Sequence, residues 1–345
     1  MEVFSVTHRL VLLYMMLFSV LSSAQDHVRT WALDEIRIRD PFVLADPVSQ
    51  TYYMYAQMGN RLNRQHNKQG VEAYTSTDLR TWSGPYSVFE IPPGFWATGP
   101  VWSPEVHLYN DRYYLVVTFT GADTLPASPG RPLNQQRGVQ ILAADSPLGP
   151  FIPFHNRAHT PAGCMAVDGT LWVEDGNPWL LYCHEWIQAV DGTVELVQLK
   201  RDLSDVYGES SALFNASDAA WVKNIREAGG EYRGKAWDGY VADGPFVYRT
   251  KAGHLLMIWS SFSEQQYAVG LAISQSGKIY GPWKQYDEPL FADNRGSGMI
   301  LRALNGTLML VVHQPNRGPE ERAKFYLLED EGNSVRVADD KPLIE

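Results

Sequence analysis

Cysteine is nearly absent from this chain of 345 residues, which holds two, Cys164 and Cys183. Disulfides therefore cannot form the framework of so long a chain, and its core must be stabilised by packing. If the two cysteines lie on adjacent antiparallel strands joined by a turn at 174–177, they fall out of register with each other. We therefore expect two buried thiols and not a disulfide.

Long apolar runs are equally scarce. The longest, Val11 to Leu21, is well short of the roughly 20 residues that a membrane-spanning helix needs. It follows a weakly basic start and precedes small residues up to Ala24, which is the pattern of a secretory signal peptide. We expect residues 1–24 to be this leader, the chain to have no membrane span, and the mature protein to be secreted or periplasmic.

Positive charge is also in short supply, because 29 Lys and Arg face 39 Asp and Glu, a formal net charge of -10. Such a surface repels the phosphates of nucleic acids and of anionic membranes. We therefore expect no nucleic-acid partner. Helical patterning is weak as well. Its one candidate, SDAAWVKNIREAGGEYRGK at 217–235, is expected to be a surface insertion with one short helix.

One repeated unit, in contrast, is abundant: a polar entry, a short apolar strand, a turn, and a second strand rich in Tyr, Leu and Val. Five copies begin near residues 39, 103, 166, 242 and 296. Turns such as Asn110-Asp111 and Asn305-Gly306 favour positive φ, so each copy is expected to be an antiparallel hairpin. A weaker strand pair follows each hairpin. The pattern predicts an all-β fold, a five-bladed β-propeller with four antiparallel strands per blade, as a single domain over residues 25–345.

Acidic residues mark the entries of the repeats. In a propeller the first strand of every blade lines the central channel, and all five begin at the same end. An Asp before Gly or Pro is by itself a favoured turn residue. Carboxylates gathered at one opening repel each other, however, and a fold keeps them more readily for binding or for proton chemistry. The five entries are Asp40, Glu105, Asp168, Asp243 and the stretch Gly296-Ser297-Gly298.

Carboxyl groups on opposite sides of a glycosidic bond can hydrolyse it, one as a proton donor and the other as the base that activates water. Aromatic residues near the same opening, such as Trp102 and Phe42, would give a sugar ring apolar faces to contact. The expected partner is therefore an oligo- or polysaccharide, bound by a monomer.

At these entries the chain resembles glycoside hydrolase family 43, over about residues 31 to 330. The resemblance implies a five-bladed propeller that cleaves arabinofuranosyl, xylosyl or galactofuranosyl linkages with inversion. It implies the general base at Asp40 in "RDP" and, at Asp168 in "DGT", an aspartate that tunes the pKa of the acid. The stretch "WSPEVH" looks like the second-blade entry of the family, which places Glu105 and Trp102 against the substrate.

Two departures from the family pattern leave roles open. The fourth blade reads Asp243-Gly244-Pro245 where the family usually has a glutamate as general acid, and an aspartate is one methylene shorter. The proton donor is therefore Asp243, or Glu105, or Glu185 at the end of "YCHEW", where the second strand of blade three returns to the opening. Two further residues are candidates for contact with sugar, His184 and Arg302.

The fifth blade is the second departure, because it has Ser297 where many relatives present a histidine. A hydroxyl is a poorer metal ligand than imidazole. We therefore expect no metal and no other cofactor, and a serine here speaks against a central calcium. The missing glutamate also keeps open a rival class, a propeller that binds glycans without cleaving them.

Overall fold

The computed structural model describes residues 29–58, 68–126, 131, 134–264 and 266–344. The expected leader at 1–24 lies outside the described residues. No helix in these described ranges is long and apolar enough to cross a membrane.

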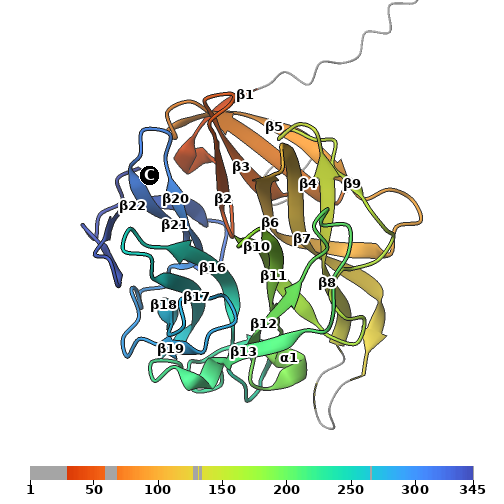
Figure 1. Cartoon of the computed structure of the whole chain (residues 1–345). Helices are drawn as coiled ribbons and strands as arrows, with labels where there is room; N and C mark the ends of the chain where they lie inside the picture. Colours follow the sequence, from red (N-terminus) through yellow and green to blue (C-terminus); the bar gives the residue numbers. More distant parts are fainter. Residues whose placement is uncertain (1–28, 59–67, 127–130, 132–133, 265, 345) are drawn as a thin grey trace, which may run out of the picture.

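Five antiparallel sheets surround a central channel, and each is built from consecutive strands (Figure 1). This confirms the predicted five-bladed β-propeller. Blade 1 is β2 (Phe42–Asp46), β3 (Thr51–Gln57), β4 (Gly70–Ser76) and β5 (Thr81–Glu90), with β1 (Arg29–Ala32) added outside β5. Blade 2 is β6 (Ala97–Tyr109), β7 (Arg112–Leu125), β8 (Asn134–Ala144) and β9 (Ile152–Pro153).

The other three blades repeat this order from the channel outward. Blade 3 is β10 (Ala166–Glu174), β11 (Asn177–His184), β12 (Thr193–Gln198) and β13 (Ser211–Asn215). Blade 4 is β16 (Asp243–Arg249), β17 (Leu255–Ser263), β18 (Gln266–Ser274) and β19 (Trp283–Gln285). Blade 5 is β20 (Gly296–Arg302), β21 (Leu308–Gln314), β22 (Arg322–Asp330) and β23 (Val335–Val337).

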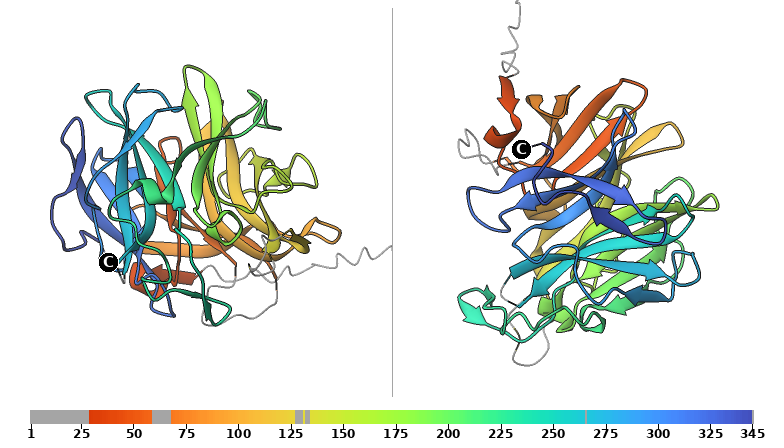
Figure 2. Two further views of the ribbon diagram at one scale, coloured as in Figure 1. Left: turned by 90° about the horizontal axis from the view of Figure 1, so that it is seen from below. Right: turned by 90° about the vertical axis from the view of Figure 1, so that its left-hand side faces the viewer.

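The inner hairpins turn where the sequence predicts. Positive φ is found at Asn110, Asp111, Asp175 and Gly306, which are turn residues that tolerate it. Apolar side chains from neighbouring blades meet between the sheets, as Leu256 of blade 4 and Leu310 of blade 5 do. Figure 1 shows the five blades arranged around the axis, and Figure 2 shows the same molecule from two sides. The core therefore consists of the inter-blade layers.

Both cysteines are free, as predicted. Cys183 pairs across the β10–β11 ladder with Val167 and is fully buried, whereas Cys164 lies before β10 and is half-buried. The expected burial therefore holds for Cys183 and only in part for Cys164.

The insertion between blades 3 and 4 contains no α-helix, which corrects the expectation for 217–235. A 3-10 turn, η2 (Ala216–Asp218), leads into turns and a small hairpin of β14 (Glu231–Tyr232) and β15 (Lys235–Ala236). Glycines at 229, 230 and 234 interrupt the segment, and glycine disfavours a helix interior. Helical structure in the described residues is otherwise limited to η1 (Leu33–Glu35) and α1 (Trp186–Ala189).

The ring closes between residues 33–40 and blade 5. Ile38 donates its N–H to the carbonyl of Glu321 at 3.2 Å. The Glu321 carboxylate accepts from Arg37 Nη2 at 2.9 Å and lies 3.5 Å from Arg39 Nη1. Arg39 also donates to Asn316, which follows β21. Since no described strand is shared between the first and last blades, these contacts form the seam of the propeller.

Candidate active site

In or just before the first strand of each blade, one residue at the mouth of the channel has a left-handed backbone conformation. The five φ values are 50° at Asp40, 46° at Ser103, 54° at Asp168, 53° at Gly244 and 41° at Ser297. In blades 2 to 5 the ladder between the first two strands is interrupted at this point by a bulge. A bulge re-aims side chains and is frequent next to active sites. These five residues occupy equivalent positions, and all of them line one pocket.

This equivalence corrects two matches expected from the sequence. The counterpart of Asp40 in blade 4 is Gly244, and Asp243 precedes it as Arg39 precedes Asp40. In blade 2 the counterpart is Ser103, so Glu105 lies two residues farther along its strand. The sequence motifs therefore aligned Asp243 one position early and Glu105 two positions late relative to Asp40. The motifs do not reveal the bulges, which change the strand register.

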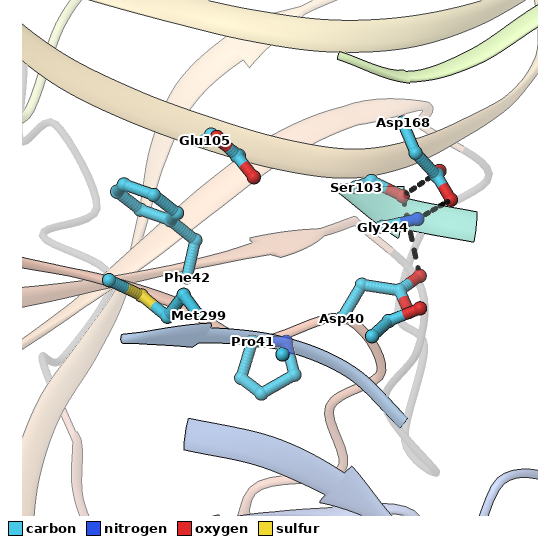
Figure 3. A pocket seen from close by; sticks show the side chains of 10 residues that line it. Asp40, Pro41, Phe42, Ser103, Glu105, Asp168, Gly244 and Met299 are labelled. Atoms are coloured by element: carbon cyan, nitrogen blue, oxygen red, sulfur yellow. Dashed lines mark hydrogen bonds between the residues drawn. The ribbon is translucent and has the colours of Figure 1, made fainter. Parts of the chain in front are cut away.

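The pocket has a volume of about 20 Å³, enough for about one water molecule. Figure 3 shows Asp40, Ser103 and Asp168 converging on it from three blades. It is lined by Asp40, Pro41, Phe42, Ser103, Glu105, Asp168, Gly244, Ser297, Gly298 and Met299.

Ser103 connects two of the acids. Its hydroxyl donates to Asp168 Oδ1 at 2.5 Å and lies 3.4 Å from Asp40 Oδ2. The other oxygen of Asp168 accepts the N–H of Gly244 at 3.0 Å. Burial, and then the charge of Asp40, raise the pKa of Asp168 to about 6. Asp168 is thus a fixed carboxyl with both oxygens bonded, beside a second carboxylate.

Asp40 has one carboxylate oxygen, Oδ1, that accepts no hydrogen bond from the described residues, although it lies 3.4 Å from His313 Nδ1. Its N–H donates to Nδ1 of the buried His313 at 3.2 Å, and Arg39 Nε lies 3.6 Å from Oδ2. Burial, and then the Arg39 charge, hold the pKa of His313 well below its usual range, so the ring is neutral. Its Nδ1 lone pair already accepts the N–H, and Asp40 Oδ1 is buried without a hydrogen-bond partner among the described residues. A buried acceptor of this kind is suited to hold a water molecule.

Asp243 lies beside Tyr267 of β18. The tyrosine hydroxyl donates to Asp243 Oδ2 at 2.7 Å and lies 3.3 Å from Ser297 Oγ. Burial, followed by the charges of Asp168 and Glu185, raises the pKa of Asp243 well above its ordinary value. A raised pKa favours the protonated carboxyl, which is the form that a general acid needs. The sequence reasoning missed Tyr267, because it stands in a third strand and outside every entry motif.

Glu185 and Arg137 form a buried ion pair next to these acids. Arg137 Nη1 donates to Glu185 Oε2 at 2.7 Å, and the two residues are 6 % and 8 % exposed. The guanidinium carbon lies 4.0 Å from the ring centroid of Trp102, the residue before Ser103. Burial raises the pKa of Glu185, and the Arg137 charge acts against that rise.

Glu105 and Phe42 line the pocket below the ring of entry residues. Glu105 Oε2 lies 2.9 Å from His107 Nε2, and burial raises the pKa of this carboxyl. Phe42 packs against the His107 ring with centroids 5.1 Å apart. Among the described residues no group of three or more His, Cys, Asp or Glu side chains is arranged to hold a metal ion. The donor set of the described residues therefore does not fit a central cation.

Two of the residues predicted from the sequence lie elsewhere. His184 Nε2 is 2.8 Å from Gln188 Oε1, and its ring faces a separate open concavity with Cys164 and Glu195. It points away from the acids because successive side chains on extended backbone alternate in direction, and Glu185, the first residue after β11, takes the other direction. Arg302 ends β20 at the opposite end from Ser297 and contacts Tyr248 Oη at 3.1 Å.

Carboxyl groups from four blades meet at one mouth of this five-bladed propeller, and paired carboxyl groups are what hydrolysis of a glycosidic bond requires. The chain belongs to the glycosyl hydrolases family 43, whose model matches residues 35–328.

Solved structures agree with this assignment. An endo-arabinase from Bacteroides thetaiotaomicron is 35% identical with a TM-score of 0.75, over 90% of this chain and 98% of that one. An endo-1,4-beta-xylanase from the same organism is 19% identical, with a TM-score of 0.66 over 91% and 98% of the two chains. An exo-1,5-alpha-L-arabinanase from a bovine ruminal metagenomic library is 17% identical, with a TM-score of 0.59 over 90% and 99%. The last two show the shared fold alone. A search of curated proteins found no match.

Proposed function

We propose that this glycosidase hydrolyses arabinofuranosyl linkages in oligo- or polysaccharides and inverts the anomeric configuration. The observation that carries the proposal is that Asp40 and Asp243, two acids at the mouth, have different surroundings. Asp40 has a buried oxygen that accepts no hydrogen bond from the described residues, whereas the pKa of Asp243 is raised well above its ordinary value. A base and an acid at one site are what single displacement requires.

The proposed reaction uses these acids in one step. Asp40 Oδ1 takes a proton from a water molecule, whose oxygen forms a bond to the anomeric carbon. The bond from that carbon to the leaving oxygen breaks, and Asp243 donates its proton to this oxygen. Asp168, fixed by Ser103 and Gly244, holds negative charge near Asp243 and so keeps its proton in place until the leaving group needs it.

The choice of sugar rests on the endo-arabinase at 35% identity, which supports an arabinofuranosyl substrate. Xylosyl and galactofuranosyl linkages remain the competing substrates. The site would contact the sugar through Trp102 and Phe42, since aromatic faces pack against sugar rings. We also propose that the protein is exported after removal of residues 1–24, which N-terminal sequencing of the mature protein would test.

The test compares nitrophenyl α-L-arabinofuranoside, β-D-xyloside and β-D-galactofuranoside, together with linear arabinan. We expect the arabinofuranosyl substrates to be turned over fastest and NMR to show an inverted first product. D40N and D243N should each lower kcat by about 10²- to 10⁴-fold. The exposed Asp145, which pairs with Arg112 on the surface, provides the control D145N with full activity. A retained configuration, or full activity in D40N, would overturn the mechanism, and binding without turnover would favour a glycan-binding propeller.

A further inference from the structure

The ion pair of Arg137 and Glu185 joins two blades beside the reacting acids. Arg137 comes from β8 of blade 2, and Glu185 follows β11 of blade 3. Both are more than nine-tenths buried, and their contact is 2.7 Å long. Burying two charges is costly, and removing one partner of such a pair leaves the other uncompensated. The pair therefore calls for an explanation beyond packing.

Arg137 is held in place from a second side. Its guanidinium carbon is 4.0 Å from the Trp102 ring centroid, and Trp102 precedes the serine that connects Asp40 and Asp168. The Nε–H of Arg137 is buried without a hydrogen-bond partner in the described part of the chain. Its orientation is therefore set by the bond to Glu185 and by stacking on the indole ring.

Glu185 acts on the acids through its charge. It is one of the groups that raise the pKa of Asp243, after burial and Asp168. The titratable groups that interact with Glu185 through their charge are Arg137 from β8, Asp168 from β10, Asp243 from β16, Cys183 from β11, and His184, whose ring lies in the separate concavity. Those that face Asp243 are Asp168, Glu185, Cys183, Tyr267 from β18, and Arg39 ahead of β2.

We propose that Arg137 is a positioning residue for the reaction: it keeps Glu185 ionised beside the mouth and thereby leaves the transferable proton on Asp243. The inference rests on the proposed function, because it assigns roles among the acids of that site. It assigns Glu185 a fixed negative charge in place of the role of proton donor, since a nearby guanidinium favours the ionised form of a carboxyl group.

Removal of Arg137 is expected to lower the pKa of Asp243. Without the guanidinium, Glu185 is a buried unpaired carboxyl, so its pKa rises further and it takes up a proton. The lost negative charge then lowers the pKa of Asp243. Because a general acid must be protonated, the alkaline limb of the kcat/KM profile moves to lower pH.

The experiment records pH profiles of kcat/KM with nitrophenyl α-L-arabinofuranoside for wild type, R137M, R137K and E185Q. In R137M and E185Q we expect the alkaline limb to move down by about one pH unit, which lowers kcat/KM about tenfold above the limb. In R137K, which keeps the charge, we expect a smaller shift. The control R112M removes a surface arginine that pairs with the exposed Asp145 and should leave the profile unchanged.

Two results would overturn the inference. One is an alkaline limb of the kcat/KM profile that does not move in E185Q. This result does not depend on an arginine variant, so it tests the inference even if R137M fails to fold. The other is an E185Q enzyme that is inactive at every pH but active on a dinitrophenyl substrate, which needs no proton donor; Glu185 would then be the acid. If D40N and D243N are also fully active, the proposed function itself fails. If they are inactive while the limb of E185Q stays in place, the role of Arg137 alone is wrong.

Discussion

The ring of Tyr267 fills the space that a side chain at residue 296 would occupy. A Cβ built on Gly296 would lie 1.9 Å from the Tyr267 ring, closer than any packed contact allows. The entry of blade 5 therefore needs glycine so that the tyrosine can reach Asp243 of its own blade 4 and Ser297 of blade 5. This pair of residues shows that the site depends on the contact between blades as well as on the entry motifs.

Loss of the Tyr267 hydroxyl is predicted to move the alkaline limb to higher pH. The hydrogen bond from Tyr267 favours the ionised form of Asp243, so Y267F should raise the pKa of this carboxyl further. We expect kcat to fall about tenfold, because the carboxyl loses a positioning contact. Comparison with R137M, for which the opposite shift is expected, is the control. The single variant G296A, whose Cβ would displace the Tyr267 ring, should lose activity as Y267F does. A fully active G296A would show that the position of Tyr267 beside Asp243 is not needed.

The Ser103 hydroxyl is predicted to be required for full rate. S103A breaks the connection between Asp40 and Asp168 and removes a bond that lowers the pKa of Asp168. We expect kcat with the arabinofuranoside to fall by about 10- to 100-fold, with KM less affected. S261A is a matched control, since the buried Ser261 hydroxyl has no hydrogen-bond partner in the described residues. Equal activity in the two variants would contradict the role of Ser103.

Asp168 is predicted to make the protein less stable as the pH rises. Its pKa in the folded state is about 6, above the ordinary value of 3.8. Between these values the native state binds more protons than the unfolded state, so the stabilisation is complete below about pH 4 and is lost as pH rises through about 6. D168N should remove this part of the pH dependence. The check is the unfolding midpoint of both proteins across this range, and parallel curves would refute the prediction.

Glu321 is predicted to stabilise the ring. E321Q weakens the contacts to Arg37 and Arg39 at a site that is 5 % exposed, so the free energy of unfolding should fall by about 1–3 kcal/mol. On the same blade, E329Q weakens an exposed pair with Arg336, and we expect at most about 1 kcal/mol there. Denaturant unfolding of both variants tests the difference, and equal losses would count against a special seam contact.

The sequence was sufficient for the fold because the repeated hairpins carry turn residues and apolar strands in a fixed order. It also indicated the acids that gather at the mouth, Asp40, Asp168 and Glu105. It did not predict which residue of blade 4 is equivalent to Asp40, since the bulge gives that position to Gly244 and not to Asp243. Tyr267 and Arg137 escaped notice because third strands carry no motif, and their place beside the acids depends on how one blade packs against the next.

The seam between the first and last blades also carries the proposed base. Asp40 is the last residue of the closing segment 33–40, and its own N–H donates to His313 across that seam. A local opening at this joint would displace the base while all five sheets are still folded. Hydrolysis thereby reports on ring closure, and on gentle heating we expect activity to disappear before the circular dichroism of the β-sheets changes.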